Sequence, residues 1–268
     1  MQNSMNINII DCRLCTHESH YVFSHTILQK YTVSYFLCST CGLLQTERPY
    51  WLKEAYASPI NNTDTGLLSR NDNLKQLCAL LVYFWLDVKG TYLDYAGGYG
   101  VFTRMMRDIG FDFYWTDPYT KNIFAIGFDY AKQQTIDGIT AFEVLEHLEE
   151  PITEIEQMLE ISDVIFCSTF LFDESHIPDP AWHYYGFDHG QHIALYSKKT
   201  LEYIAKRYHL YLYSNNKNLH ILSRKKLPYF SFKLLYMLRR WGAMRYITRK
   251  LTSKTSGDSV LLSTQTYE

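Results

Sequence analysis

Apolar residues recur at strand-like and helix-like intervals through the middle of the chain. Two β-type runs, residues 91–95 and 111–116, flank an amphipathic segment in which Val101, Met105 and Ile109 are spaced as on one face of a helix. A tight turn of small residues separates the first run from this segment. The order strand, turn, helix, strand predicts the opening unit of an α/β sheet.

The chain before this unit contains a predicted linker and a predicted helix. Residues 57–70 are rich in Asn, Thr and Gly, which is typical of a linker. We expect the helix that follows, which Asn71 or Asp72 can cap, to precede the first strand of the sheet. Its apolar side consists of Leu74, Leu77, Leu81, Trp85 and Val88.

The chain after residue 117 adds further predicted elements. We expect a short helix over residues 121–127, a third strand within 124–130 and a fourth strand at 139–142. The uninterrupted apolar run 163–170 is typical of a central parallel strand, which is covered on both faces. The helix between these last two strands is expected to bury Ile152, Ile155, Met158 and Leu159.

An irregular stretch, residues 171–197, contains four of the ten histidines. Long loops in compact domains are usually functional or disordered, and the aromatic and imidazole side chains here favour a functional loop. A helix is expected from about Lys198, and residues 209–224 alternate around an Asn-rich turn as in a β-hairpin. An antiparallel hairpin at the end of the sheet is not expected in a dinucleotide-binding dehydrogenase.

Composition narrows the class of protein. Of 268 residues, 47% are hydrophobic and 20% are charged, which predicts a sizeable buried core. No apolar run reaches the roughly 20 residues of a membrane span, and the first residues lack the pattern of a signal peptide. We therefore expect a cytoplasmic location. The 23 tyrosines fit a carbohydrate-binding surface as well as an ordinary core, and no nucleic-acid-binding module is recognisable.

The net charge of −2 conceals a basic C-terminal segment. Residues 224–268 carry ten lysine or arginine residues and two acids, and no acid occurs between residues 224 and 257. This segment is expected to form one or two helices with apolar faces. It is either a solvated basic face that packs on the acidic remainder, or a surface that attracts a phosphate-bearing substrate or an anionic membrane.

Two C-x-x-C pairs near the N-terminus predict a metal site. Cys12, Cys15, Cys38 and Cys41 can supply four thiolates in tetrahedral geometry. Because no ligand position is left open, we expect the metal to have a structural role. Zinc is the first choice, and iron in a rubredoxin-like site has the same ligand spacing.

The small-residue turn carries candidate ligand-binding chemistry. Gly98 and Gly100 allow a ligand to approach the backbone closely, and Asp117 at the end of the second strand can accept hydrogen bonds from ribose hydroxyls. A dinucleotide fingerprint would need a glycine where Thr103 stands. Asp94, just before the turn, would repel a pyrophosphate but suits a ligand with a cationic amino-acid end.

The turn resembles motif I, D-x-G-x-G-x-G, of the class I S-adenosylmethionine-dependent methyltransferases. Asp94, Gly98 and Gly100 match this motif, and Ala96 replaces its first glycine. The resemblance implies that these four residues line the amino-acid end of S-adenosylmethionine and that Asp117 holds its ribose. It also implies that the residues after the fourth strand, Phe142 and Glu143, lie beside the cofactor.

Motif I, the segment 143–151, the hairpin and the four cysteines together resemble zinc-bearing sugar methyltransferases. These include nucleotide-sugar C-methyltransferases and enzymes encoded with surface-polysaccharide glycosyltransferases. Their segment N-V-L-x-H reads here with Glu143 in place of Asn and ends at His147, and their E-H-L-S-Y-x-S reads with Gln191 before His192. A tyrosine three residues before that histidine becomes His189. The resemblance implies a histidine base, for which His192 is preferred over His189 and His147.

The predicted fold class is α/β, a Rossmann-like class I methyltransferase sheet with a terminal antiparallel hairpin. The predicted segments are a zinc-binding domain (1–60), an S-adenosylmethionine-binding domain (61–223) and a basic aromatic extension (224–268). The expected function is methyl transfer to a sugar or glycan precursor. The alternatives are methyl transfer to a non-sugar small molecule such as a quinol, a non-catalytic zinc-bearing binding protein of the same fold, and a nicotinamide enzyme.

Overall fold

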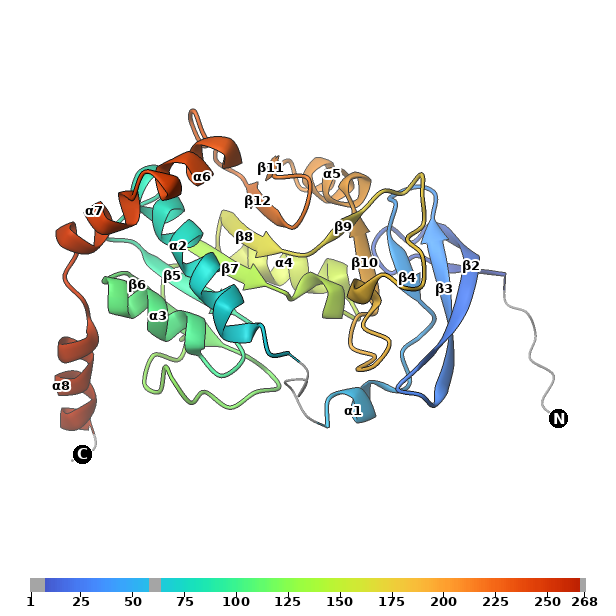
Figure 1. Cartoon of the computed structure of the whole chain (residues 1–268), viewed down its shortest axis with the longest axis horizontal. Coiled ribbons are helices and arrows are strands. Elements are labelled where there is room, and N and C mark those ends of the chain that lie inside the picture. Colours follow the sequence, from blue (N-terminus) through green and yellow to red (C-terminus); the bar gives the residue numbers. More distant parts are fainter. Residues whose placement is uncertain (1–7, 58–63, 266–268) are drawn as a thin grey trace. The chain divides into compact units, whose positions relative to one another are not determined.

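The computed structural model describes residues 8–57 and 64–265 (Figure 1). Contacts group the chain into two compact units. Unit 1 contains Met1–Asn61, Glu143–Gln157 and Cys167–His220, and unit 2 contains Asn62–Phe142, Met158–Phe166 and Ile221–Glu268. The three segments predicted from the sequence divide the chain differently and stay a prediction, and their boundary at residues 60 and 61 lies outside the described residues.

One six-stranded sheet has the order β11-β12-β8-β7-β5-β6. Its strands are β5 (Thr91–Tyr95), β6 (Asp112–Thr116), β7 (Gly138–Phe142), β8 (Val164–Ser168), β11 (Tyr211–Ser214) and β12 (Leu219–Ser223). Strand β5 pairs in parallel with β6 and with β7, so Asp94 lies in register with Trp115 on one side and Thr140 on the other. The predicted strands at 91–95, 111–116, 139–142 and 163–170 are therefore confirmed, and β11 and β12 occupy the predicted hairpin.

The helices that accompany this sheet are α2 (Leu67–Trp85), α3 (Val101–Ile109) and α4 (Pro151–Ile161). Helix α3 buries Phe102, Met106 and Ile109, whereas Val101 and Met105 are only half-buried. The predicted apolar face was therefore displaced by one residue at two of its three positions. The reason is that the turn before α3 sets the angle at which its first residue emerges, which the spacing alone does not determine.

Helix α2 begins earlier than predicted. Its N-cap is Gly66, and Asn71 and Asp72 lie inside the helix. Both polar side chains find partners there, because Asn71 Nδ2 donates to Leu67 O and Asp72 pairs with Lys75. The predicted linker is thus helical from residue 67, and its residues 58–63 lie outside the described part of the chain.

The predicted helix at 121–127 and the predicted third strand within 124–130 are wrong. Residues 121–127 form bends and turns, because the Asn122 side chain accepts from Ala125 N and donates to Ala125 O, in competition with a helix. The strand is reduced to an isolated parallel bridge between Trp115 and Asp129.

Unit 1 contains a second sheet, of order β1-β2-β3-β4-β10-β9. Its strands are β1 (Ile9–Asp11), β2 (Glu18–Ile27), β3 (Tyr31–Cys38), β4 (Leu44–Thr46), β9 (Leu171–Phe172) and β10 (Ala194–Ser197). The stretch 171–197, predicted as a loop, therefore supplies two strands to this sheet, and β10 pairs antiparallel with β4. Trp51, Tyr35 and Tyr185 are among the large side chains of its core.

Two helices, α1 (Leu52–Ala55) and α5 (Lys198–Arg207), and two 3₁₀ turns complete this part of the chain and its connections. The helix α1 follows β4, and α5 starts at Ser197, whose hydroxyl accepts from Thr200 N in a capping box. The 3₁₀ turns are η1 (Leu145–His147) and η2 (His183–Tyr185). The helix expected near Lys198 is confirmed.

The basic C-terminal segment forms α6 (Phe232–Arg240), α7 (Ala243–Lys250) and α8 (Thr255–Gln265), which is one helix more than the sequence predicted. Helices α6 and α7 pack against α2 within unit 2 (Figure 1). No helix in the described ranges is both long and apolar enough to cross a membrane.

A buried ion pair holds α8 within unit 2. Arg107 of α3 is only 4% exposed and donates from Nε and Nη2 to the two carboxylate oxygens of Asp258, both at 2.8 Å. Its Nη1 donates to Asp112 at 2.7 Å, and its guanidinium lies 3.6 Å from the ring centroid of Phe128. Burial opposes ionisation of Asp258, but hydrogen bonds from Arg107 and Arg104 outweigh it and lower the pKa of Asp258.

Replacing Asp258 with Ala is expected to lower the free energy of unfolding by about 3 kcal/mol, because it removes two hydrogen bonds from the buried Arg107 and leaves Asp112 to balance its charge. Since the pKa of Asp258 is lower in the folded state, its stabilisation is present above an unfolded-state pKa of about 4 and is lost in acid. Urea unfolding at several pH values measures this. The control is Asp108→Ala, which removes the exposed partner of Arg104 and should lower the free energy of unfolding by less than about 1 kcal/mol. Equal losses of stability in the two variants would contradict the prediction.

Candidate functional site

The turn after β5 places several residues in the left-handed region of backbone conformation. Ala96, Gly98 and Gly100 have φ of 53°, 56° and 82°, a conformation that glycine adopts freely and that costs an alanine about 1 kcal/mol. Gly100 is the N-cap of α3, and its N–H donates to Gly97 O at 3.0 Å. The glycines that the motif prefers are thus required by the backbone, and Ala96 occupies the same conformation at a small cost.

The buried carboxyl of Asp94 lies at the base of this turn. Its side chain accepts hydrogen bonds from Thr103 Oγ1 of α3 and Thr140 Oγ1 of β7, both at 3.0 Å. Burial raises the pKa of Asp94 to about 7, although the two threonine hydrogen bonds favour the charged form. A cationic ligand group near this carboxyl would therefore be stabilised by it and would in turn favour its ionised form.

Glycine is required at Gly97 because of the space around it. A Cβ on Gly97 would lie 2.5 Å from Asp94 Oδ2 and 2.8 Å from Trp115 Cδ1. A Cβ on Gly98 would meet no atom within 4 Å, so the turn is tightly packed on one side and open at Gly98. An open backbone surface next to a buried acid fits the approach of the amino-acid end of S-adenosylmethionine.

Asp117, the predicted ribose ligand, lies in unit 2 with this turn. Its Oδ2 accepts from Gly98 N at 2.9 Å, and its Oδ1 accepts from the N–H groups of Tyr119 and Thr120 at 2.8 and 2.7 Å. A carboxylate offers about four acceptor positions, so one remains for a hydroxyl group. Asp117 therefore also organises the turn, which the sequence did not predict.

Phe142 and Glu143, predicted to lie beside the cofactor, have separate environments. The Phe142 ring packs edge-on against Phe102 and Phe166, each with 5.0 Å between ring centroids. Glu143 has a φ of 55° and exchanges hydrogen bonds with Ser168, whose hydroxyl accepts from Glu143 N and donates to Glu143 Oε1. The left-handed backbone at Glu143 marks a sharp turn at the carboxyl end of β7, where open α/β sheets bind ligands.

The three candidate histidines meet in unit 1. The ring centroid of His192 lies 4.9 Å from that of His147 and 4.8 Å from that of His189. The Nδ1 atoms of His192 and His147 face the carbonyl oxygens of Tyr184 (2.6 Å) and Gln191 (3.1 Å). A carbonyl can only accept, so in the neutral rings both Nδ1 atoms carry the proton and each Nε2 atom is an acceptor.

His189 has the opposite tautomer. Its Nδ1 accepts from Gln191 N at 3.1 Å, which places the proton of the neutral ring on Nε2. Burial, together with the neighbouring His192 and His189, lowers the pKa of His147 well below the usual value. His147 is therefore neutral at pH 7. The geometry gives His192 and His147, rather than His189, an imidazole nitrogen that can accept a proton.

Glu146, Tyr184 and Tyr56 surround these histidines, and of these Glu146 is expected from the sequence at the carboxyl end of the fourth strand, whereas Tyr56 and Tyr184 are not. Glu146 is fully buried, and its Oε1 accepts from Tyr184 OH at 2.6 Å. Tyr56 OH lies 3.1 Å from His147 Nδ1. Glu146, His147 and His192 each have one potential ligand atom, and these three atoms lie within 4.8 Å of one another. This spacing would allow the three residues to share a proton or to bind a metal ion. Only Glu146 carried a signal, since it follows β7 closely; Tyr56 lies far away in sequence.

Gly186 is a further residue that the sequence did not single out. It has a φ of 62°, and a Cβ there would lie 2.3 Å from Cε1 and from Nε2 of His189. Any other residue at this position would displace the His189 ring. A glycine directly after the pair of tyrosines in the histidine-rich stretch was the available signal.

The four cysteines form one buried cluster, as predicted. The four sulfur atoms all lie within 4.8 Å of one another. Two pairs of sulfur atoms are closer, Cys15–Cys38 at 3.3 Å and Cys12–Cys41 at 3.5 Å. Zn–S bonds of about 2.3 Å in a tetrahedron place sulfur atoms roughly 3.8 Å apart, so the cluster fits a zinc ion. A hydrogen bond with Cys41 lowers the pKa of Cys12 to about 5, while burial raises that of Cys15 to about 12.

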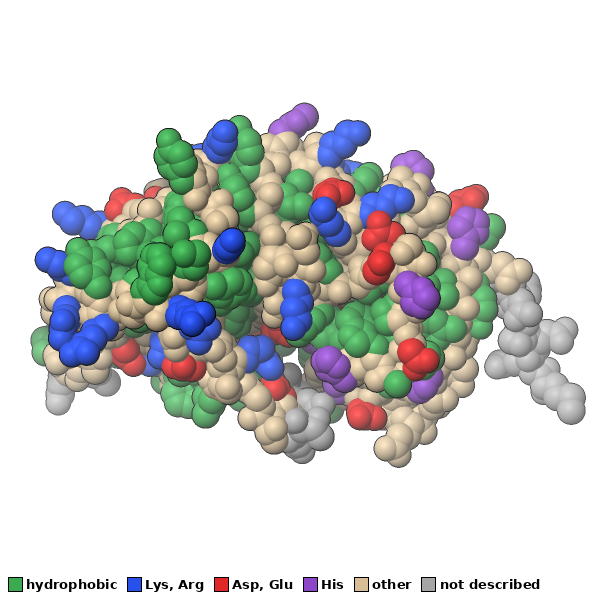
Figure 2. Space-filling view, turned by 45° about the horizontal axis from the view of Figure 1, so that its top comes forward, with side chains coloured by type: hydrophobic (Ala, Val, Ile, Leu, Met, Phe, Trp, Pro, Cys, Tyr) green, Lys and Arg blue, Asp and Glu red, His purple; other side chains and the backbone are tan. Residues whose placement is uncertain are grey.

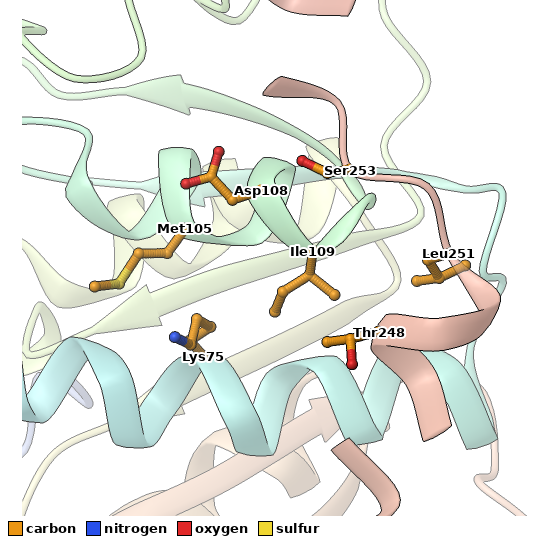
Figure 3. Close-up of a pocket in the computed structure, with 7 residues that line it drawn as sticks. All are labelled: Lys75, Met105, Asp108, Ile109, Thr248, Leu251 and Ser253. Carbon is orange, nitrogen blue, oxygen red and sulfur yellow. The ribbon is translucent and has the colours of Figure 1, made fainter. Parts of the chain in front are cut away.

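A surface hollow of about 320 Å³ lies elsewhere in unit 2 (Figure 3). It is lined by Lys75 of α2, by Met105, Asp108 and Ile109 of α3, and by Thr248 of α7, among others. Figure 3 shows Lys75, Met105, Ile109 and Thr248 in the space between α2 and α3, with Leu251 and Ser253 of the C-terminal chain beside it. None of the candidate site residues lines it.

The chain matches the model of a known protein family over the residues that form the turn and the histidine group. A family model described as "Methyltransferase domain" matches residues 69–215, more than half of the chain. The chain belongs to the methyltransferase-domain family. The match includes the turn after β5, Asp117 and the three histidines, and it excludes the four cysteines and α6–α8. A search of curated proteins found no match.

Solved methyltransferase structures show weak similarity to the chain. An O-methyltransferase family 2 protein from Planctomyces limnophilus, in complex with apigenin, is 12% identical over 65% of this chain and 65% of its own, with a TM-score of 0.42. Magnesium protoporphyrin IX methyltransferase from Synechocystis with bound SAM is 15% identical over 65% and 92%, with a TM-score of 0.38. Human N-acetylserotonin methyltransferase is 11% identical over 67% and 67%, with a TM-score of 0.39. The chain thus spans about two thirds of the first of these, and at such scores the likeness says nothing about the site.

Elemental analysis of the purified protein is expected to find one metal ion, zinc, per chain. Cys38→Ala should abolish it and destabilise the fold by several kcal/mol, because structural zinc contributes roughly 10 kcal/mol or more in small domains. Cys78→Ala is the matched control, since Cys78 is equally buried in α2 and lies outside the cluster. Full metal content in Cys38→Ala would refute the site. A second equivalent that is lost only in His192→Gln would instead place a metal on Glu146, His147 and His192.

Proposed function

We propose that this protein transfers a methyl group from S-adenosylmethionine to a sugar or glycan precursor, with a histidine as the general base. The observation that carries the cofactor assignment is the buried Asp94 at the base of a left-handed turn that is open at Gly98. When bound, S-adenosylmethionine supplies an activated methyl group. The protein's own tasks are to orient the donor and the acceptor and to remove a proton from the acceptor.

The turn in unit 2 supplies the groups for the cofactor. Asp94, Ala96, Gly98 and Gly100 are assigned to its amino-acid end, and Asp117 to its ribose hydroxyls. Asp117 keeps an acceptor position for this purpose while it holds the turn through Gly98 N. Phe142 and Glu143 are assigned to its surroundings on the basis of the resemblance alone.

The histidines in unit 1 supply the base. His192 is preferred because the Tyr184 carbonyl holds its proton on Nδ1 and leaves Nε2 able to accept one. His147 has the same tautomer and is the second choice. His189, with Nδ1 engaged by Gln191 N, is better suited to donate a hydrogen bond from Nε2 than to accept a proton.

The sugar acceptor rests on the resemblance of residues 143–147 and 191–197 to sugar methyltransferases. The tyrosine- and histidine-rich surroundings of His192 are compatible with hydroxyl groups of a sugar. The four-cysteine site is assigned a structural zinc ion, and a cytoplasmic location stays a prediction. A non-sugar small-molecule acceptor, and a binding protein without activity, are the alternatives that the following experiments separate.

Calorimetric titration of the metal-loaded protein with S-adenosylmethionine is expected to show micromolar binding, and titration with NADH none. Asp117→Ala should weaken the binding at least about tenfold, because one hydrogen bond from a ribose hydroxyl to a charged carboxylate is lost at roughly 1.5 kcal/mol. Asp108→Ala, an exposed acid on α3, should leave it unchanged. Absence of binding to the folded wild-type protein would leave the zinc-bearing binding protein as the remaining interpretation.

His192→Gln is expected to slow the release of S-adenosylhomocysteine in the presence of nucleotide sugars by about 10²–10⁴-fold, the range for loss of a general base. Binding of S-adenosylmethionine should not change, which separates a catalytic defect from a folding defect. His176→Gln, an exposed histidine in the same stretch, serves as the control. If only non-sugar acceptors support turnover, the base assignment survives and the sugar assignment is rejected.

A further inference from the structure

Helices α6 and α7 present an unusual surface in unit 2. Phe232 and Leu235 of α6 and Ile247 of α7 are buried, and both helices pack on α2. Their other sides, together with the segment before α6, leave large apolar side chains in solvent. The most exposed are Tyr229 at 95%, Trp241 at 69% and Tyr246 at 50%.

Basic side chains surround these aromatic residues. Exposed lysine or arginine side chains without an ion-pair partner in the described part of the chain are Lys226, Lys233, Arg240, Arg245, Arg249 and Lys250. Figure 2 shows hydrophobic and basic side chains interleaved over the part of the view where α6 and α7 lie. We call the exposed side chains of residues 226–250 the basic–aromatic surface.

Few acids offset this charge. Residues 224–257 contain none. Asp163 pairs with Arg224 and Lys225. The charge of Arg239, after the hydrogen bond from Lys75, contributes to lowering the pKa of Asp72. These contacts involve the base of the surface and leave its outward cations unneutralised. The segment packs on α2 through its apolar side, while its outward cations stay in solvent. This agrees with the solvated basic face expected from the sequence, and it leaves the outward surface available to an anionic partner.

The arrangement on α6 is amphipathic with a mixed outer face. Lys233, Met237 and Arg240 follow one another at helical spacing on the exposed side, and Trp241 comes directly after them. Long basic side chains that flank a tryptophan and a methionine are suited to the boundary between lipid headgroups and acyl chains. The cations meet lipid phosphates there, while the aromatic rings enter the apolar edge of the bilayer.

We propose that the basic–aromatic surface docks the protein onto an anionic membrane. The attraction has two parts that can be separated by experiment. Each cation near an anionic surface strengthens binding about fivefold at physiological salt, and burial of an exposed tryptophan adds roughly tenfold or more that depends little on salt. This inference does not depend on the methyl-transfer reaction.

The experiment is cosedimentation of the full-length, metal-loaded protein with phosphatidylcholine vesicles that contain or lack phosphatidylglycerol. We expect binding to the anionic vesicles to be more than about 25-fold stronger than to the neutral ones, since several cations each contribute about fivefold. Arg245→Gln with Arg249→Gln should reduce it about 25-fold, and Trp241→Ala roughly tenfold even at high salt. All three positions are exposed, so we expect the variants to fold. Thermal unfolding checks that they do.

A matched control removes the same net charge outside the surface. Lys132→Gln with Lys206→Gln, both exposed, should change vesicle binding by less than about twofold. The proposal is overturned if this control weakens binding as much as the arginine pair does, or if neutral vesicles bind equally well. It is also overturned if vesicles do not bind while Trp241→Ala abolishes self-association in sedimentation velocity, which would identify a second copy of the chain as the occupant. Binding to single-stranded RNA but not to vesicles would overturn it in favour of a nucleic acid.

Discussion

A buried carboxyl within a parallel sheet constrains much of unit 2. Asp94 is 3% exposed, and a charged or partly charged group at such a depth is tolerated only when hydrogen bonds compensate for lost hydration. Thr103 of α3 and Thr140 of β7 supply those bonds. The carboxyl also leaves no room for a side chain at Gly97. The position of α3, the pairing of β5 with β7 and the tight turn between strand and helix are therefore linked through one side chain.

The corresponding constraint in unit 1 is the pairing of β4 with β10. It brings the carbonyl of Ile193 to Thr46 N at 3.0 Å, and Arg13, between the first two cysteines, also donates to this carbonyl through Nη2. Ile193 N in turn donates to Glu146 O at 2.9 Å. A single residue next to His192 thus joins the cysteine knuckle to the turn that carries His147. Formation of the four-cysteine cluster and placement of the histidines are two consequences of the same strand pairing.

Local patterns and long-range pairing explain which features the sequence could predict. The strands around Asp94 were predictable because their apolar runs and the glycine turn are contiguous. The four-cysteine cluster was predictable because metal ligation demands a recognisable spacing. The segment after Asp117 was mispredicted because the Asn122 side chain replaces helical hydrogen bonds with its own. Strand β10 could not be predicted, since its partner β4 lies about 150 residues earlier and four residues carry little periodicity. Tyr56 reaches His147 through the same kind of long-range contact.

The histidines affect one another's protonation, which could not be seen from any one of them alone. In their neutral forms His147 and His192 both direct their protons to backbone carbonyls, so their remaining nitrogens are acceptors in a partly desolvated setting. Protonation of either ring raises the cost of protonating the other, and His147 shows this as a pKa lowered by burial and by its two neighbours. The group is therefore built to take up one cation at a time. A base that accepts a single proton during methyl transfer and then releases it requires the same behaviour.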